Sequence, residues 1–449
     1  MTNAPLPSLA NALLEAATRA GADAADALVV DGTSVSIGVL NGALEQAERS
    51  EGIDMGLRVL VGQRQACVSA SDTSLDTLRE MAERAVAMAQ LAPEDPYAGL
   101  ADAEQLSDLR DGDALDMNDT GEDPDPARLE AMALAAEAAA LAVEGVAQVS
   151  DAGAGFSRRE IFLAATNGFA GGYTRTDHGL HCIAITGEGA AMERDYFGDG
   201  RNHASDLMSP EEVGRIAAER TVARAGAKKP PTGAFPVMYD ERVAGGLIGH
   251  LLAASNGTAI ARGASWARDL LGEQVLPKGL SLIEEPLRPR TSASRPFDAE
   301  GLATANRTIV EDGVLTGWTL DLSTARKLGL SSTASATRST GAPPSPSVGN
   351  VRLTQGDLSR EALLREMGTG LLITSLIGSS INATTGDYSR GASGFWVENG
   401  EIAYPVNECT VAGNLRDMLR VLTPANDARA HISRVIPSVL VEGLTIAGA

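Results

Sequence analysis

The chain has 449 residues, which is enough for two or three domains, each with its own core. Its 59 acidic and 37 basic residues give a net charge of −22, which disfavours direct contact with nucleic-acid backbones or anionic membranes. Cys67, Cys182 and Cys409 are too widely spaced for a disulfide framework or a CxxC zinc site. Because the N-terminus also lacks a signal-peptide pattern, we expect a soluble, cytoplasmic protein without membrane or nucleic-acid partners.

The first half of the chain predicts an α+β domain in which an antiparallel sheet packs against helices. Helices are expected at Leu9–Ala20, Asp72 to about Leu91, Pro126 to about Val143, and Pro210–Ala225. Strands are expected at Ser34–Leu40, Ala43–Arg49, Ile53–Val61, Arg64–Ser69, Ala147–Asp151, Glu160–Thr166, Gly172–Thr176 and His181–Glu188. Hairpin-type turns at Asn41-Gly42, Glu51-Gly52 and Gly62-Gln63 make the first four strands a meander. The acidic stretch Asp95–Asp125 is expected to form a surface loop.

The segment Ala227–Phe235 predicts a linker, since it follows a helix and contains Pro230-Pro231 without apolar periodicity. We therefore expect an N-terminal α+β domain over residues 1–226 and a mostly β C-terminal domain over residues 236–449. The second domain should contain helices at Glu241–Ser255 and Ser359–Met367, a buried strand at Gly370–Ile377, and hairpins at Asp312-Gly313 and Asn399-Gly400. Ser331–Ser347 is rich in Ser, Thr, Ala and Pro, and its composition predicts a mobile loop.

The helix after the linker carries one candidate metal ligand, His250. Val243, Leu247 and Leu251 define its apolar stripe, Asp240 is a plausible N-cap, and Gly257 is expected just beyond its end. A lone histidine beside such a stripe is more often structural than a ligand, and Gly245 and Gly246 supply no second donor.

A second candidate is Asp177–Cys182, the densest grouping of metal-ligand residue types. In an extended strand, His178 and Cys182 share one face whereas His181 points to the other. No fourth ligand follows at a recognisable spacing, which favours a structural interpretation.

A polar, glycine-rich stretch at Thr385–Phe395 has two interpretations. It is either a binding loop whose backbone amides face a ligand, or a tight connection into a Phe395–Val406 hairpin. The tentative substrate-binding residues are Thr385, Gly386, Asp387, Tyr388, Ser389, Gly391, Gly394 and Phe395. Nucleotide-binding and α/β-hydrolase motifs are absent from the sequence.

Several blocks of the sequence resemble the TldD/PmbA family, also known as peptidase U62 or modulators of DNA gyrase. The most specific block is Asn382–Leu415 (NATTGDYSRGASGFWVENGEIAYPVNECTVAGNL), which is similar to the TldE-side signature of the family. The N-terminal meander, Ile161–Thr176 and Pro437–Gly448 fit as well, so the resemblance spans nearly the whole chain.

The resemblance implies a subunit without its own catalytic metal. The catalytic paralogue, TldD, carries HExxxH on a helix, in which two histidines would hold zinc and the glutamate would act as the base. Here the motif falls on Gly245–His250, so that Gly245 and Gly246 replace the first histidine and the glutamate, and Cys409 does not match the zinc cysteine. The expected function is that of a TldE-like subunit, inactive alone and without cofactor, in a heterodimer with a zinc-containing TldD-type partner that cleaves peptides or unfolded proteins.

Two other classes of function stay open. One is an independent metal-dependent hydrolase using His178, His181 and Cys182. The other is a homodimeric interaction or scaffold protein without catalytic activity.

Overall fold

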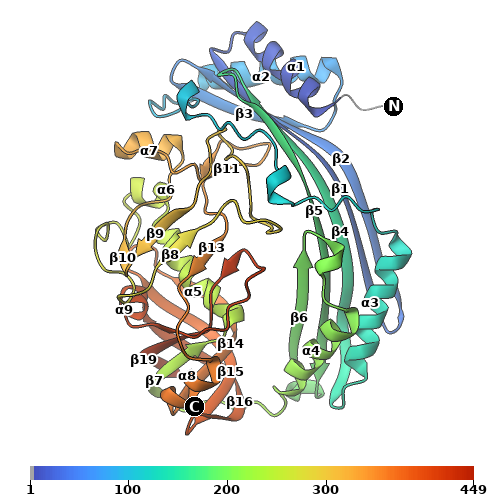
Figure 1. Cartoon of the computed structure of the whole chain (residues 1–449), viewed down its shortest axis with the longest axis vertical. Coiled ribbons are helices and arrows are strands. Elements are labelled where there is room, and N and C mark those ends of the chain that lie inside the picture. Colours follow the sequence, from blue (N-terminus) through green and yellow to red (C-terminus); the bar gives the residue numbers. More distant parts are fainter. Residues whose placement is uncertain (1–4, 449) are drawn as a thin grey trace.

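The computed structural model describes residues 5–448 and shows an α+β protein in which a long, arched sheet embraces a β-rich C-terminal part (Figure 1). The N-terminal sheet has six antiparallel strands in the order β3-β2-β1-β4-β5-β6. Its strands are β1 (Ala24–Leu40), β2 (Ala43–Val61), β3 (Arg64–Ala70), β4 (Val146–Ala165), β5 (Ala170–Thr186) and β6 (Glu193–Arg201). The helices of this half are α1 (Leu6–Ala20), α2 (Leu75–Leu91), α3 (Pro126–Leu141) and α4 (Pro210–Val222).

The predicted meander is confirmed at two turns and wrong at the third. Asn41-Gly42 and Gly62-Gln63 connect strands, whereas Glu51-Gly52 lies within β2, where Gly52 pairs with Gly32 of β1. Two glycines facing each other in neighbouring strands mimic a turn signal in the sequence, although the backbone stays extended. In the same way, the shorter strands expected after residue 146 merge into β4 and β5.

The four helices form two separate cores at the two ends of the sheet. α1 and α2 pack at one end around Leu13, Met55 and Leu57, while α3 and α4 pack at the other around Ala136 and Phe156. The N-cap of α2 is Ser74 rather than the expected Asp72, whose carboxylate instead accepts hydrogen bonds from Ser74 and Thr77. No helix within residues 5–448 is both long and apolar enough to cross a bilayer.

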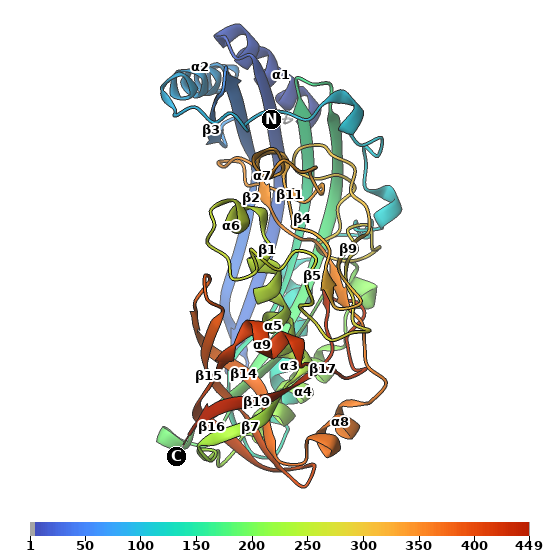
Figure 2. The same ribbon diagram turned by 90° about the vertical axis from the view of Figure 1, so that its left-hand side faces the viewer.

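The C-terminal part is built on a closed barrel, in the strand order β16-β15-β14-β7-β19-β17, with β16 also pairing with β19 (Figure 2). These strands are β7 (Gly233–Tyr239), β14 (Gly370–Ile381), β15 (Asp387–Glu398), β16 (Glu401–Asn414), β17 (Thr423–Pro424) and β19 (Val439–Ala447). A smaller sheet contains β8 (Leu282–Glu284), β9 (Arg307–Glu311), β10 (Val314–Leu315), β13 (Val351–Leu353) and β18 (Arg434–Val435). The helices are α5 (Glu241–Ala254), α6 (Gly257–Ala261), α7 (Leu322–Leu328), α8 (Arg360–Met367) and α9 (Leu415–Arg420).

The hairpins predicted at Asp312-Gly313 and Asn399-Gly400 are confirmed, and all four turn residues have positive φ, as such turns require. β7 begins at Gly233, so the last residues of the predicted linker belong to the barrel.

Residues 331–347 are anchored between the two parts of the molecule. The prediction that their composition leaves them little to bury is wrong, because Ser335 and Ala336 are buried and a short hairpin pairs β11 (Ala336–Thr337) with β12 (Ser345–Pro346). The fully buried side chain of Arg338 forms an ion pair with Asp26 of β1. The composition of a segment indicates only whether it can form a core by itself. Residues 331–347 are buried because they pack against the N-terminal sheet, which the composition could not reveal.

We expect Arg338→Met to loosen this anchor, because the buried Asp26 carboxylate would keep only Arg58 as its charged partner. The free energy of unfolding should fall by about 2–3 kcal/mol, the scale of a hydrogen bond to a charged group. Residues 331–347 should also become cleavable in limited proteolysis. Chemical denaturation and mass mapping of the cuts measure both effects. The exposed Arg84→Met, which has no ion pair among the described residues, is the control, and equal behaviour of the two variants would contradict the anchor.

Candidate functional site

Helix α5 is positioned by its cap and by its apolar face. The Asp240 side chain accepts a hydrogen bond from the Arg242 N–H, as predicted for the N-cap, while Leu247, Ile248 and Leu251 are buried in the largest core of the molecule. Its C-cap is Ser255, so the expectation that Gly257 follows the helix end is wrong: Gly257 is the first residue of α6. Gly245, Gly246 and His250 therefore lie on a regular helix that is firmly packed on the core.

The opposite face of α5 is bare at the two glycines. A Cβ atom at Gly246 would meet nothing within 4 Å, and one at Gly245 would meet only the aliphatic part of Arg434 at 3.9 Å. The guanidinium of Arg434 donates a hydrogen bond to the Gly245 carbonyl oxygen at 3.3 Å. A cationic side chain thus lies where the first motif histidine would project.

His250 faces another neighbour, Tyr388 of β15, with ring centroids 5.9 Å apart in an edge-on arrangement. Burial lowers the pKa of His250, and the positive charge of Arg390 lowers it further. The imidazole is therefore held in its neutral form near neutral pH. Neutral imidazole is the form that binds metal, but no second ligand comes from its own helix.

Most of the stretch predicted as a possible binding loop is strand. Residues 387–398 form β15, and only the residues before them make a turn, which is closed by the hydrogen bond from the Gly386 N–H to the Asn382 carbonyl. The Thr385 hydroxyl donates to Asp387 at 2.6 Å, and the Asn414 amide donates to both Thr385 and Asp387 at 3.1 Å. These bonds lower the pKa of Asp387 and keep the carboxylate ionised.

The predicted substrate-binding residues divide into three groups, of which Thr385 and Gly386 form the turn before β15 and do not line a groove. Asp387, Tyr388 and Ser389 line an open groove of about 650 Å³ together with residues 380–383. Gly391, Gly394 and Phe395 lie further along β15 and do not line it. A Cβ at Gly394 would come within 1.9 Å of the Leu372 carbonyl oxygen, so this glycine is required by the close approach of β14.

The grouping at Asp177–Cys182 lies in β5, which confirms the predicted alternation. His178 and Cys182 are buried, whereas His181 is exposed on the other face and contacts Asp151 at 3.0 Å. Burial raises the pKa of Cys182 to about 12, so its thiol stays protonated. Among residues 5–448, no group of three or more His, Cys, Asp and Glu side chains is arranged to hold a metal ion.

Cys409 is buried too. Its thiol donates a hydrogen bond to the Ala392 carbonyl at 3.1 Å, and burial raises its pKa to about 11. The side chain therefore serves the packing of β15 on β16.

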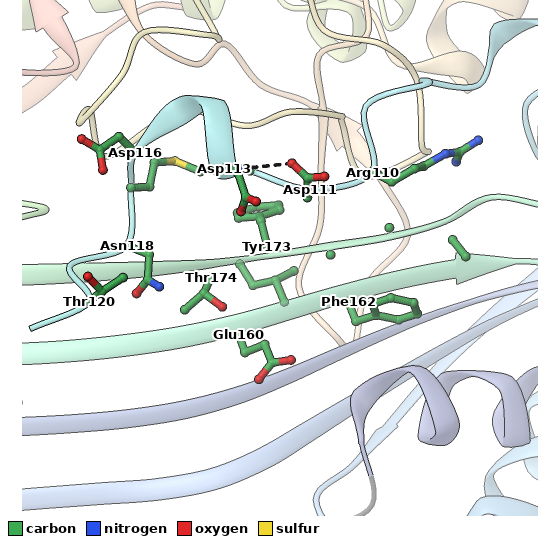
Figure 3. Close-up of a pocket in the computed structure, with 16 residues that line it drawn as sticks. Arg110, Asp111, Asp113, Asp116, Asn118, Thr120, Glu160, Phe162, Tyr173 and Thr174 are labelled. Carbon is green, nitrogen blue, oxygen red and sulfur yellow. Dashed lines mark hydrogen bonds between the residues drawn. The ribbon is translucent and has the colours of Figure 1, made fainter.

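A cavity of about 580 Å³ that the sequence did not indicate lies between residues 110–120 and strands β4 and β5 (Figure 3). Asp113 lies over Tyr173 on one side, while Glu160 and Thr174 project from the strands below. Its three aspartates come from a segment whose composition predicts only a surface loop, so residue types alone could not locate the cavity.

Comparisons with known proteins place the chain in a family of metallopeptidase-type proteins. The PmbA/TldA metallopeptidase domain 1 matches residues 25–89, the central domain residues 119–225, and the C-terminal domain residues 232–448. The chain is 38% identical to Metalloprotease PmbA of Escherichia coli O157:H7, over 95% of this chain and 92% of that protein. A PmbA homolog of Haemophilus influenzae is also 38% identical, over 97% and 94%. The chain belongs to the PmbA/TldD family.

Solved structures share the whole fold. A Bacteroides thetaiotaomicron protein described as a modulator of DNA gyrase superposes with a TM-score of 0.88 at 25% identity, and both chains are fully covered. TldE from Thermococcus kodakarensis superposes with a TM-score of 0.83 at 19% identity, over 98% of this chain and 99% of that one. At 19% identity, the similarity to the Thermococcus kodakarensis protein shows a shared fold only.

We expect Arg390→Gln to raise the pKa of His250, because the nearby cation disfavours the protonated ring and its removal relieves that repulsion. An NMR titration of the imidazole signals measures the midpoint. Arg434→Gln is the matched control, because it removes an arginine that contacts Gly245 of the same helix and should leave the pKa of His250 unchanged. A midpoint that moves equally in both variants would mean that the electrostatic neighbour of His250 is misassigned.

Proposed function

We propose that this chain is the non-catalytic, TldE-like subunit of a two-subunit zinc metallopeptidase that degrades or processes peptides and unfolded proteins. The catalytic zinc would lie in a TldD-type partner, with which this chain forms a heterodimer. The proposal rests on α5, which carries Gly245 and Gly246 where the family resemblance implies the first histidine and the glutamate of HExxxH.

The surroundings of α5 support the proposal. A peptidase zinc needs three protein ligands and a base that takes the proton of its bound water. Only His250 remains on α5, and Cys409 is a protonated thiol buried between strands. The guanidinium of Arg434 beside Gly245 would repel a divalent cation at that position.

The groove beside α5 suggests how the subunit contributes. Asp387, Tyr388 and Ser389 line its wall, and the fixed carboxylate of Asp387 offers an acceptor for a peptide N–H. We infer that these residues contact the peptide chain, while the partner supplies the chemistry. The net charge of −22 argues against nucleic acid as the substrate.

The first test is an assay of the separate and combined subunits. The purified chain alone should not cleave peptides, because it lacks ligands and base, whereas adding the TldD-type paralogue should give cleavage that a chelator abolishes. A paralogue without the glutamate of its HExxxH motif is the control and should restore nothing. Chelator-sensitive turnover by this chain alone would instead favour an independent hydrolase. If the chain forms only a homodimer on size-exclusion chromatography and leaves the paralogue's cleavage unchanged, the scaffold alternative holds.

The second test restores the two missing motif residues. We expect the double variant Gly245→His, Gly246→Glu to fold, since neither Cβ meets a close contact and both substitutions raise helix propensity. It should nevertheless bind zinc weakly and stay inactive. Five positions on a regular helix correspond to about 500°, which leaves the imidazoles at residues 245 and 250 about 140° apart.

Zinc content after dialysis and peptide cleavage are measured beside each single variant. Stoichiometric zinc with partner-free cleavage would show that two side chains alone separate this subunit from an active one.

A further inference from the structure

A cavity of about 370 Å³ lies at the junction of the N-terminal sheet and the C-terminal part, away from α5. The N-terminal half contributes Arg58, Gln65, Glu94, Asp95 and residues 97–99. The C-terminal half contributes residues of α6 and α7, Glu300, and residues 343–345. Cavities at domain junctions, where few side chains of opposite charge converge, are common sites for small ligands.

The floor of the cavity carries buried charges of both signs. Arg58 and Asp321 are each 3% exposed, and both are satisfied: Arg58 pairs with Asp26, and Asp321 caps α7 through the Thr324 N–H. Glu300 is 8% exposed and only half satisfied. Its Oε2 accepts the Leu322 N–H at 2.9 Å, whereas no hydrogen bond from residues 5–448 reaches its Oε1. When Glu300 is ionised, this oxygen accepts no hydrogen bond from the described residues and is available to a donor of a ligand.

The more exposed rim also carries both signs, but its two acids have partners: Glu94 pairs with Arg64 at 3.1 Å, and Asp95 accepts a hydrogen bond from the Tyr97 N–H. Arg262, just after α6, and Lys327 of α7 are exposed, and neither forms an ion pair with any described residue. These two cations are therefore available to an anion that enters the cavity. A ligand that satisfies floor and rim together must present a cationic donor at one end and an anion at the other.

We propose that this cavity binds a small zwitterion, a free amino acid or a dipeptide, with its ammonium group at Glu300 and its carboxylate at Arg262 and Lys327. An ammonium group supplies the donor that Glu300 Oε1 lacks, and the guanidinium and ammonium of the rim match a carboxylate. The inference does not depend on the peptidase assignment, since the site is complete within this chain.

The electrostatics of Glu300 agree with this placement. Burial and the neighbouring Asp298 raise its pKa to about 8, Asp321 adds to the rise, and Arg58 opposes it. A cation bound at Oε1 favours the ionised form, so binding releases a proton from Glu300. Affinity for the ammonium group therefore increases as the pH rises toward 8.

The test is isothermal titration calorimetry on the isolated chain with L-alanine and with alanyl-alanine, which separates the two sources of the zwitterion. We expect at least one of them to bind. Its N-acetylated and C-amidated derivatives, each lacking one charge, should bind at least about tenfold more weakly, the scale of one lost charged hydrogen bond. Glu300→Gln should weaken binding similarly, while its amide oxygen can still accept the Leu322 N–H and keep α7 in place.

Two surface variants are the matched controls. Glu311→Gln, at an exposed strand end, is the control for Glu300→Gln. Lys278→Gln, on an exposed loop, is the control for Lys327→Gln. Both controls should bind like the unaltered chain, whereas Lys327→Gln should weaken binding of the zwitterion but not of the C-amidated form. The proposal is overturned if neither compound binds at millimolar concentration, if blocking either end has no effect, or if Glu300→Gln binds like Glu311→Gln. None of these results bears on whether the chain assists a partner's proteolysis.

Discussion

The arrangement of the two halves depends on a buried cluster of charges around Asp26. Burial alone would raise the pKa of this carboxyl, but Arg58 from the neighbouring strand and Arg338 from the C-terminal part outweigh it and hold the pKa below its ordinary value. Because the folded-state pKa is depressed, the stabilisation is present near neutral pH and is lost as the pH falls through that pKa. The same contact fixes Thr340 against Gly56, where any Cβ would come within 2.2 Å of the Thr340 oxygen. The junction is thus specified by charge and by shape together.

Burying three charged groups between two surfaces has a large desolvation cost, so the cluster must do more than hold the surfaces together. Removing three charges from water costs several kcal/mol per ion, and an apolar interface of the same size is often as stable. Two nitrogens of Arg338, Nε and one of the terminal pair, lack hydrogen-bond partners among the described residues, so the cluster is not optimised for stability. The ion pair does fix the position of residues 331–347 along the N-terminal sheet, because Arg338 must reach Asp26. In this position Pro343 and Ser345 line the cavity at the junction of the two parts.

The sequence predicts what depends on local pattern and fails where distant segments meet. The N-cap of α5, the hairpins at Asp312 and Asn399 and the alternation of His178 with His181 follow from residue chemistry at short range. The length of β2 does not, because only the partner Gly32 keeps the backbone extended at Gly52. Glu300 gave no signal either, since its neighbours come from remote parts of the chain. The α5 candidates were found through resemblance, and physical reasoning then explained what surrounds them.

Under the function proposed above, the loss of the motif on α5 is more than the loss of two side chains. The bare glycine face is now bordered by the guanidinium of Arg434 on one side and by Tyr388, packed on His250, on the other. A metal site depends on donors that are oriented by a second layer of hydrogen bonds, so that its parts act together rather than additively. Each surviving element is engaged in another contact, and the buried thiol of Cys409 is held by a carbonyl on β15. A metal site on this face of α5 would therefore require the second layer of hydrogen bonds to change together with the ligands.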